Sequence, residues 1–305
     1  MTYSSQAISG DSCFIERIQH GNFTGRVHSI FDRTFNIQSE DRGELFTIAN
    51  ESLDNGPNTL VTEFTHFSEM DIAIDDRVYA MNNTLCILNK IKIKLDDAKK
   101  WNSVLPPYPA NEQQLRRNLN AARLIIDHYG KNGGMKRSHT DGSSFDQEVT
   151  RLLAERSRLL LQAISRGSMQ QAEREAAGLV GLGFGLTPSG DDFLVGLFVV
   201  FNLPMSPLYH CRSFCMQVAA QSIGRTNEIS YITLKKAATG QARESLIRLL
   251  RDLTVGSEES MRASLGSVLN IGSTSGTDIA IGIVSGLELS AEKKAGGKVC
   301  QRKLL

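Results

Sequence analysis

A chain of 305 residues with 41% hydrophobic and 22% charged residues has the composition of a folded globular protein with one large or two ordinary domains. Its formal net charge of +1 argues against nucleic acid as the main partner, because little positive charge is available to replace condensed counterions. The longest apolar run, residues 193–201, is too short to span a bilayer, so no membrane partner is expected. The N-terminus lacks the apolar core of a secretory signal, and five scattered cysteines indicate reduced thiols, so we expect a cytoplasmic location.

The first hundred residues favour β-strands. Four short β-prone segments, residues 26–30, 45–48, 60–64 and 77–81, are separated by turn signals such as Asn82-Asn83. Ile91, Ile93 and Leu95 alternate with lysines at 90, 92 and 94, which is typical of a strand with one face in water. Because no helical pattern interrupts these segments, we expect a small antiparallel barrel or sandwich over residues 1–108.

Helical periodicity begins after a proline-rich linker at residues 101–110. Asn111 is placed to cap a helix, and Ser168, with a glutamine three residues later, is placed to cap another. The Gly-, Ser- and Lys-rich stretch 130–144 between them is expected to be a mobile loop. The fold class is therefore α+β, with a mainly helical domain at 109–291 and a basic, disordered tail at 292–305.

Two segments of the helical region nearly repeat each other. Residues 189–197 read Ser-Gly-Asp-Asp-Phe-Leu-Val-Gly-Leu, and residues 275–283 read Ser-Gly-Thr-Asp-Ile-Ala-Ile-Gly-Ile. Each follows a loop that contains Gly and Thr and enters an apolar helix. The N-terminus of a helix offers free N–H groups and the positive end of the helix dipole. The pair therefore predicts an anion-binding pocket between two helix starts.

The first loop carries three alternate glycines, at 181, 183 and 185, which permit close backbone approach. Ser189 and Asp192 have the spacing of a capping box at the start of a helix that is apolar on every side. A well-capped central helix would explain these two residues. It leaves Asp191 unexplained, because adjacent helical positions point about 100° apart.

A carboxylate pair beside an anion site would repel the anion, and two explanations reconcile them. A Mg²⁺ ion could bridge Asp191 or Asp192 to substrate oxygens. Alternatively, the ligand carries N–H donors as well as negative charge, and an ionised aspartate accepts from those donors. The second explanation implies an amide or ureido acid.

A third loop, residues 224–230, holds Arg225 ahead of a helix that Thr226 or Asn227 would cap. Arg225 is a cation suited to a carboxylate or phosphate. Taken alone, this loop is an ordinary helix cap, and its interest comes from its similarity to the other two loops.

The run Gly183-Phe-Gly-Leu-Thr-Pro-Ser-Gly-Asp-Asp-Phe-Leu-Val-Gly196 resembles the signature of the AllH-like family. Thr226-Asn227 with Ser230, and residues 272–278, fall where that family has its next two motifs. The family is similar to a subunit of the oxamate carbamoyltransferase of purine (allantoin) catabolism, which interconverts oxalurate plus phosphate with oxamate plus carbamoyl phosphate and works with two partner proteins. Ser273 departs from the family pattern, which often has His there, and this puts an acid–base role at that position in doubt.

The resemblance and the residues together define a set of expected site residues. The expected catalytic residues, which orient the ureido nitrogen or hold Mg²⁺, are Asp191, Asp192 and Asp278. The expected substrate-binding residues lie in the three loops: Gly183, Gly185, Thr187, Ser189, Gly190, Arg225, Thr226, Asn227, Ser230, Ser273, Thr274, Ser275 and Gly276.

Two other functions are compatible with the same loops. A non-catalytic subunit could use the pocket only to bind a metabolite or act as a scaffold within a complex. The run 187–196 is also reminiscent of the ribokinase-type sugar-kinase signature, although such kinases need an extended α/β sheet before it.

Overall fold

The computed structural model describes residues 3–136 and 144–302. The chain divides into two compact units, Met1–Ser103 and Val104–Leu305, and each is described by itself. Within the part of the chain that is described, no helix is long and apolar enough to cross a membrane.

The first unit is a closed β-barrel. Its strands are β1 (Tyr3–Asp11), β2 (Thr24–Ile30), β3 (Thr34–Ser39), β4 (Leu45–Asn50), β5 (Thr59–Thr62), β6 (Arg77–Met81), β7 (Thr84–Ile87), β8 (Ile91–Lys94) and β9 (Lys99–Trp101). Neighbouring strands follow the order β5-β4-β3-β2-β6-β7-β8-β1, and the pairing of β1 with β5 closes the circle, while β9 adds to β1. This confirms the expected barrel. Three of its pairings, β1–β8, β1–β9 and β4–β5, are parallel.

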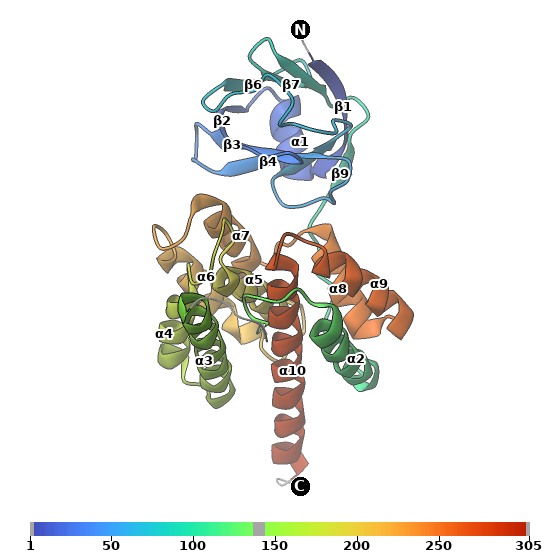
Figure 1. The fold of residues 1–305 in the computed structure, drawn as a ribbon. Helices are drawn as coiled ribbons and strands as arrows, with labels where there is room; N and C mark the ends of the chain where they lie inside the picture. Colours follow the sequence, from blue (N-terminus) through green and yellow to red (C-terminus); the bar gives the residue numbers. More distant parts are fainter. Residues whose placement is uncertain (1–2, 137–143, 303–305) are drawn as a thin grey trace. The chain divides into compact units, whose positions relative to one another are not determined.

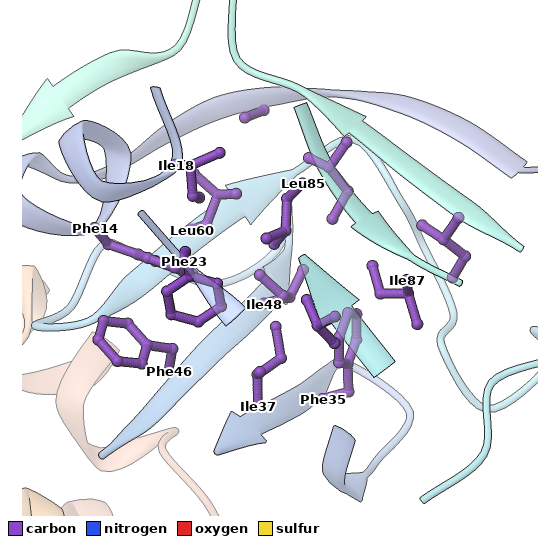
Figure 2. Packing of buried hydrophobic residues seen from close by; sticks show 14 of the residues in the cluster. Phe14, Ile18, Phe23, Phe35, Ile37, Phe46, Ile48, Leu60, Leu85 and Ile87 are labelled. Atoms are coloured by element: carbon purple, nitrogen blue, oxygen red, sulfur yellow. The ribbon is translucent and has the colours of Figure 1, made fainter. Parts of the chain in front are cut away.

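A short helix, α1 (Ser12–Gln19), packs against the barrel core. Phe14 on α1 contacts the rings of Phe23 and Phe46, with ring centroids 5.0 and 4.5 Å away (Figure 2). Asp11 caps the helix by accepting from the backbone N–H groups of its first turn. The expectation that no helix interrupts the strands was therefore wrong. Eight residues make only two turns, and such a helix depends on tertiary packing more than on local pattern.

Two local predictions for the barrel are confirmed. Asn82 and Asn83 have φ values of 48° and 58° and connect β6 to β7, and two-residue hairpins favour positive φ at both central positions. In β8, Ile91 and Ile93 are buried and the lysines that follow them are exposed.

The second unit is helical. Its helices are α2 (Gln113–Tyr129), α3 (Ser144–Arg166), α4 (Met169–Leu179), α5 (Ser189–Phe201), η1 (Tyr209–Cys211), α6 (Arg212–Gln221), α7 (Glu228–Ala238), α8 (Glu244–Val255), α9 (Glu258–Leu269) and α10 (Ser275–Arg302). Within this unit, α5 and α10 lie at the centre, with α3, α4, α6 and α7 on one flank and α2, α8 and α9 on the other (Figure 1). Every residue of α5 is buried, as its all-round apolar sequence predicts.

Several helix ends differ from the sequence predictions. Helix α2 begins after Glu112, and Asn111 accepts from the N–H of Gln113. Ser168 precedes α4 but makes no side-chain cap bond. Helix α10 continues to Arg302, so the segment expected to be a disordered tail from residue 292 is helical to that point. The expected mobile loop 130–144 lies partly outside the described residues, and its first part, to residue 136, is placed.

The twin segments belong to a longer internal repeat, in which α3–α4–α5 corresponds to α8–α9–α10. Gly-Ser precedes α4 at residues 167–168 and precedes α9 at 256–257. The loops that follow also correspond, because the N–H of Gly190 donates to Leu182 O and the N–H of Gly276 donates to Ile271 O. The two central helices are therefore equivalent elements of the two repeats.

Candidate functional site at the paired helix starts

Glycines bring the backbones of α5 and α10 together. A Cβ on Gly196 would lie less than 3.0 Å from Ile279 O, and a Cβ on Gly282 would lie less than 3.0 Å from Phe193 O. These contacts are reciprocal, because Gly196 and Gly282 occupy the same position in the twin segments. Four residues further along each helix, Gly286 likewise lies against Val200, so the two helices run in the same direction and both N-termini lie at one end of the pair. The expected convergence of the twin helix starts is therefore present in the structure.

The two helix starts also contact each other directly. The hydroxyl oxygens of Thr187, before α5, and Ser275, the first residue of α10, are 2.7 Å apart. Gly190 and Gly276 lie so close to the carbonyls of Leu179 and Val268 that no side chain would fit at either position. The predicted glycines are thus needed for packing at the helix starts.

Asp191 lies in a closed hydrogen-bond network. Its Oδ1 accepts from the N–H of Gly181 at 2.8 Å, and its Oδ2 accepts from the hydroxyls of Thr226 at 2.5 Å and Ser230 at 2.7 Å. The side chain is fully buried, with 0% exposure. Asp191 therefore ties α5 to the loop before it and to the start of α7, and three protein donors already occupy its oxygens.

The predicted capping box is absent. The N-cap of α5 is Pro188 and makes no side-chain cap bond, so Ser189 and Asp192 are free for other contacts. Because Asp192 follows Asp191 by one helical position, it points to a different neighbour, the start of α10.

Asp192 and Asp278 occupy equivalent positions in the twin segments, three residues after Ser189 and Ser275. Both are buried, and the Oδ2 atom of each has no hydrogen-bond partner among the described residues. The other oxygen of Asp278 accepts from the N–H of Met135 at 2.8 Å. Two buried carboxyl groups thus each present an unpaired oxygen at the paired helix starts.

Burial is the main cause of unusual pKa values at this pair. It raises the pKa of Asp278 to about 6, and the Met135 N–H and the nearby hydroxyls of Ser189 and Thr274 oppose this effect. Burial also raises the pKa of Asp192 well above its usual range. The Ser275 hydroxyl opposes that shift, and the charge of Asp278 adds to it. The two carboxyl groups therefore interact electrostatically across the helix pair.

The segment from Gly130 to Lys136 lies against the start of α10, and the sequence analysis did not identify it as part of the candidate site. Besides the Met135 contact, the N–H of Lys131 donates to Thr277 Oγ1 at 2.9 Å and its Nζ donates to Gly272 O at 2.6 Å. Lys136 Nζ donates to Gly130 O at 2.7 Å. A Gly-Gly pair flanked by lysines was the available signal, but nothing in the sequence relates it to α10.

The free N–H groups that we expected at the helix N-termini are not found in the first helical turns. The N–H groups of residues 190–192 donate to Leu182 O and Pro188 O, and those of 276 and 278 donate to Ile271 O and Thr274 O. The helix starts are therefore largely satisfied internally. By contrast, the backbone N–H groups of residues 183–187 and 272–274 donate to no other described residue.

The third predicted loop, residues 224–230, contacts the candidate site through hydrogen bonds to Asp191. Thr226 and Ser230 bind Asp191, while Asn227 caps α7 by accepting from the N–H of Ser230 and donates to Leu186 O. The Arg225 guanidinium donates to Ala177 O near the end of α4, so it is engaged away from Asp192 and Asp278.

The described residues hold no group of three or more His, Cys, Asp or Glu side chains that could bind a metal ion. A Mg²⁺ ion at the helix starts would rely on Asp192, Asp278 and neighbouring hydroxyl groups as its protein ligands.

A family model described as oxamate carbamoyltransferase subunit AllH matches residues 179–287, which include all three loops. A second model, described as the AllH family N-terminal domain, matches residues 6–100 and so covers the barrel. No solved structure matches the chain.

Proposed function

The chain belongs to the AllH family of oxamate carbamoyltransferase subunits, and from this premise we propose that its helical unit binds the substrate at the paired starts of α5 and α10. The reaction that we propose is the interconversion of oxalurate plus phosphate with oxamate plus carbamoyl phosphate in purine catabolism. We also propose that partner subunits are needed for activity.

One observation carries the proposal: acceptors and donors lie together at the helix starts. The unpaired Oδ2 atoms of Asp192 and Asp278 can accept from ligand N–H groups. The unpaired backbone N–H groups of 183–187 and 272–274 can donate to an anion. Oxamate, oxalurate and carbamoyl phosphate each combine an amide or ureido nitrogen with a carboxylate or phosphate.

The hydrogen bonds of Asp191 change the role that we propose for it, from contacting the substrate to supporting the site. With three protein donors on its carboxylate, Asp191 supports the site by holding α5 against α7, and Thr226 and Ser230 act with it. Substrate contacts are proposed for Asp192 and Asp278. The site would contribute alignment and charge stabilisation to carbamoyl transfer, which does not require a covalent intermediate on this chain.

The kinase alternative fails on the fold. Ribokinase-type enzymes need an extended α/β sheet ahead of the signature. Here the three helices α2, α3 and α4 occupy most of the described residues between 113 and 179. The non-catalytic alternative predicts the same binding but no loss of turnover when the site is altered.

The test is calorimetric titration of the chain with oxalurate, oxamate and carbamoyl phosphate, with and without Mg²⁺. We expect at least one ligand to bind, and Asp192→Asn and Asp278→Asn to weaken that binding about tenfold or more, because each removes an ionisable acceptor. Asp97→Asn, an exposed residue of the barrel, is the matched control. Undiminished affinity in both site variants would refute the placement of the ligand. Normal turnover of the variants with the partner subunits would favour the non-catalytic alternative.

A further inference from the structure

The helical unit has a cleft between α2 and α9, which lie side by side on one flank of the unit (Figure 1). The cleft encloses about 350 Å³, which is within the range of small-molecule sites. One face of each helix and the residues that follow them line it: Ile125, Tyr129, Lys131, Arg262, Gly266, Leu269 and Asn270. The cleft therefore has the size of a binding site, and its lining decides what it can bind.

Packing does not explain the glycine in the wall of this cleft. Gly266 lies inside α9, where glycine is less favourable than alanine, and a Cβ there would meet no described atom within 4 Å. In the internal repeat, the carbonyls of Leu179 and Val268 pack on equivalent glycines. Two residues earlier, the first repeat has Ala177 where the second has Gly266. The helix therefore accepts a side chain at this position, and glycine keeps the cleft open.

Among the described residues, two cations and no acid line the cleft: Lys131 and Arg262. Arg262 is paired with Glu258, four residues earlier, but the side chains are 54% and 58% exposed, and such a surface pair contributes little. Helix α2 ends at Tyr129 and α9 at Leu269, so two negative dipole ends face the cleft and contribute about one negative charge together. Two full positive charges exceed this by about one, so the cleft favours an anion.

The remaining lining residues suit a flat apolar group beside the anionic one. Ile125 and Leu269 are buried and give the cleft an apolar lining. The side chain of Tyr129 is largely exposed, so its ring offers an aromatic surface. The bare helix backbone at Gly266 is a second surface against which a planar group can lie. The side-chain amide of Asn270 adds one acceptor and a pair of donor hydrogens.

Lys131 connects the cleft to the start of α10. Its backbone N–H donates to Thr277 Oγ1 at 2.9 Å, and its ammonium group donates to Gly272 O at 2.6 Å. An anion in the cleft competes with that carbonyl for the ammonium group, because a charged acceptor makes the stronger hydrogen bond. Binding in the cleft therefore changes the contacts of residues 272–274, which precede α10.

We propose that the cleft between α2 and α9 binds a small, flat organic anion, and that binding there acts through Lys131 on the loop before α10. Lys131 and Arg262 hold the anionic group, and the flat body lies against Tyr129 and the bare backbone at Gly266. This site is additional to the paired helix starts, and it does not depend on the reaction that we propose for them.

Benzoate is the probe, because it is flat and carries one carboxylate. Benzamide has nearly the same shape without the charge, and inorganic phosphate has charge without the flat body. The ¹⁵N-labelled chain is titrated with each, and the backbone amide resonances of Gly266, Asn270, Ser273 and Thr274 are followed by NMR. We expect benzoate to shift all four with a Kd of about 1 mM or below, and the other two probes to bind at least about tenfold more weakly. Equal affinity for benzamide, or no saturation by benzoate below about 10 mM, would overturn the proposal.

Gly266→Leu fills the cleft and should abolish the benzoate shifts. Ala263→Leu, at an exposed position of the same helix outside the cleft, is the matched control and should preserve them. Both variants introduce a good helix former, and circular dichroism checks that both fold. Arg262→Gln adds no bulk and should weaken benzoate binding about tenfold, because a charged hydrogen bond is lost. Undiminished binding in Gly266→Leu and Arg262→Gln would overturn the placement of the anion in the cleft.

The resonances of Ser273 and Thr274 separate coupling from direct binding at the loop. We expect Gly266→Leu to remove their shifts together with that of Asn270. Shifts of Ser273 and Thr274 that survive Gly266→Leu would mean that benzoate binds at the paired helix starts, and would overturn the coupling through Lys131. Failure of oxamate and carbamoyl phosphate to bind would refute the proposed function alone, because benzoate binding in the cleft is measured without them.

Discussion

The close approach of α5 and α10 predicts that Gly196→Ala destabilises the helical unit. The new Cβ would lie less than 3.0 Å from Ile279 O, which is a backbone atom and cannot rotate away. Overpacking of a buried contact costs about 1–3 kcal/mol, and a clash with backbone belongs at the upper end of that range. Replacing glycine by alanine within a helix returns about 1 kcal/mol through helix propensity. The net loss in the free energy of unfolding should therefore be about 2 kcal/mol.

Gly266→Ala in α9 is the matched control, because nothing lies within 4 Å of its Cβ. That variant should be more stable than the parent chain by up to about 1 kcal/mol. The difference between the two variants, about 3 kcal/mol, isolates the clash. Urea denaturation followed by far-UV circular dichroism measures it, since the helical unit dominates that signal. Equal stability of the Gly196 and Gly266 variants would refute the backbone contact between the helices.

Three further predictions follow from individual residues. Asp191→Ala should lower the free energy of unfolding by about 3 kcal/mol, because it leaves buried donors unpaired, and should speed amide exchange of Gly181, whose N–H donates to Asp191; unchanged exchange would contradict the network. Burial raises the pKa of Asp278 to about 6, so protonation favours the folded state, and the parent chain should gain about 2 kcal/mol relative to Asp278→Asn as pH falls from 6 to 4; parallel stability curves for the two proteins would show that the pKa is not raised. Phe23→Ala should cost about 3–5 kcal/mol in barrel stability, measured by fluorescence of Trp101, the chain's only tryptophan; a loss under 1 kcal/mol would mean that this ring is not part of a packed core.

The barrel shows where sequence periodicity is sufficient. Alternation in β8 and the Asn82-Asn83 turn are local signals, and both predictions were confirmed. Helix α1 was missed because its buried residues, including Phe14 and Ile18, are as typical of a short strand as of two helical turns. Its stability comes from packing against the barrel core, which no local window contains.

The site shows the same division between local pattern and tertiary contact. The twin Ser-Gly segments and their glycines led correctly to two converging helix starts. The role of Asp191 was not predictable in the same way. Which of two adjacent acids is held by protein donors depends on which neighbouring helix faces each one, and α7 and α10 approach α5 from different sides.

The sequence by itself determined the fold class, the family and the three loops of the candidate site, because each of these depends on spacing and composition over short stretches. Only the tertiary structure decided that Asp192 and Asp278 form the unpaired acid pair and that Gly134 and Met135 lie beside it. The Met135 N–H and the carboxylate that it binds are 143 residues apart in the chain. The packing of α2 and the loop after it against α10 brings them together, and hydrophobic periodicity indicates that a helix face is buried without specifying its neighbour.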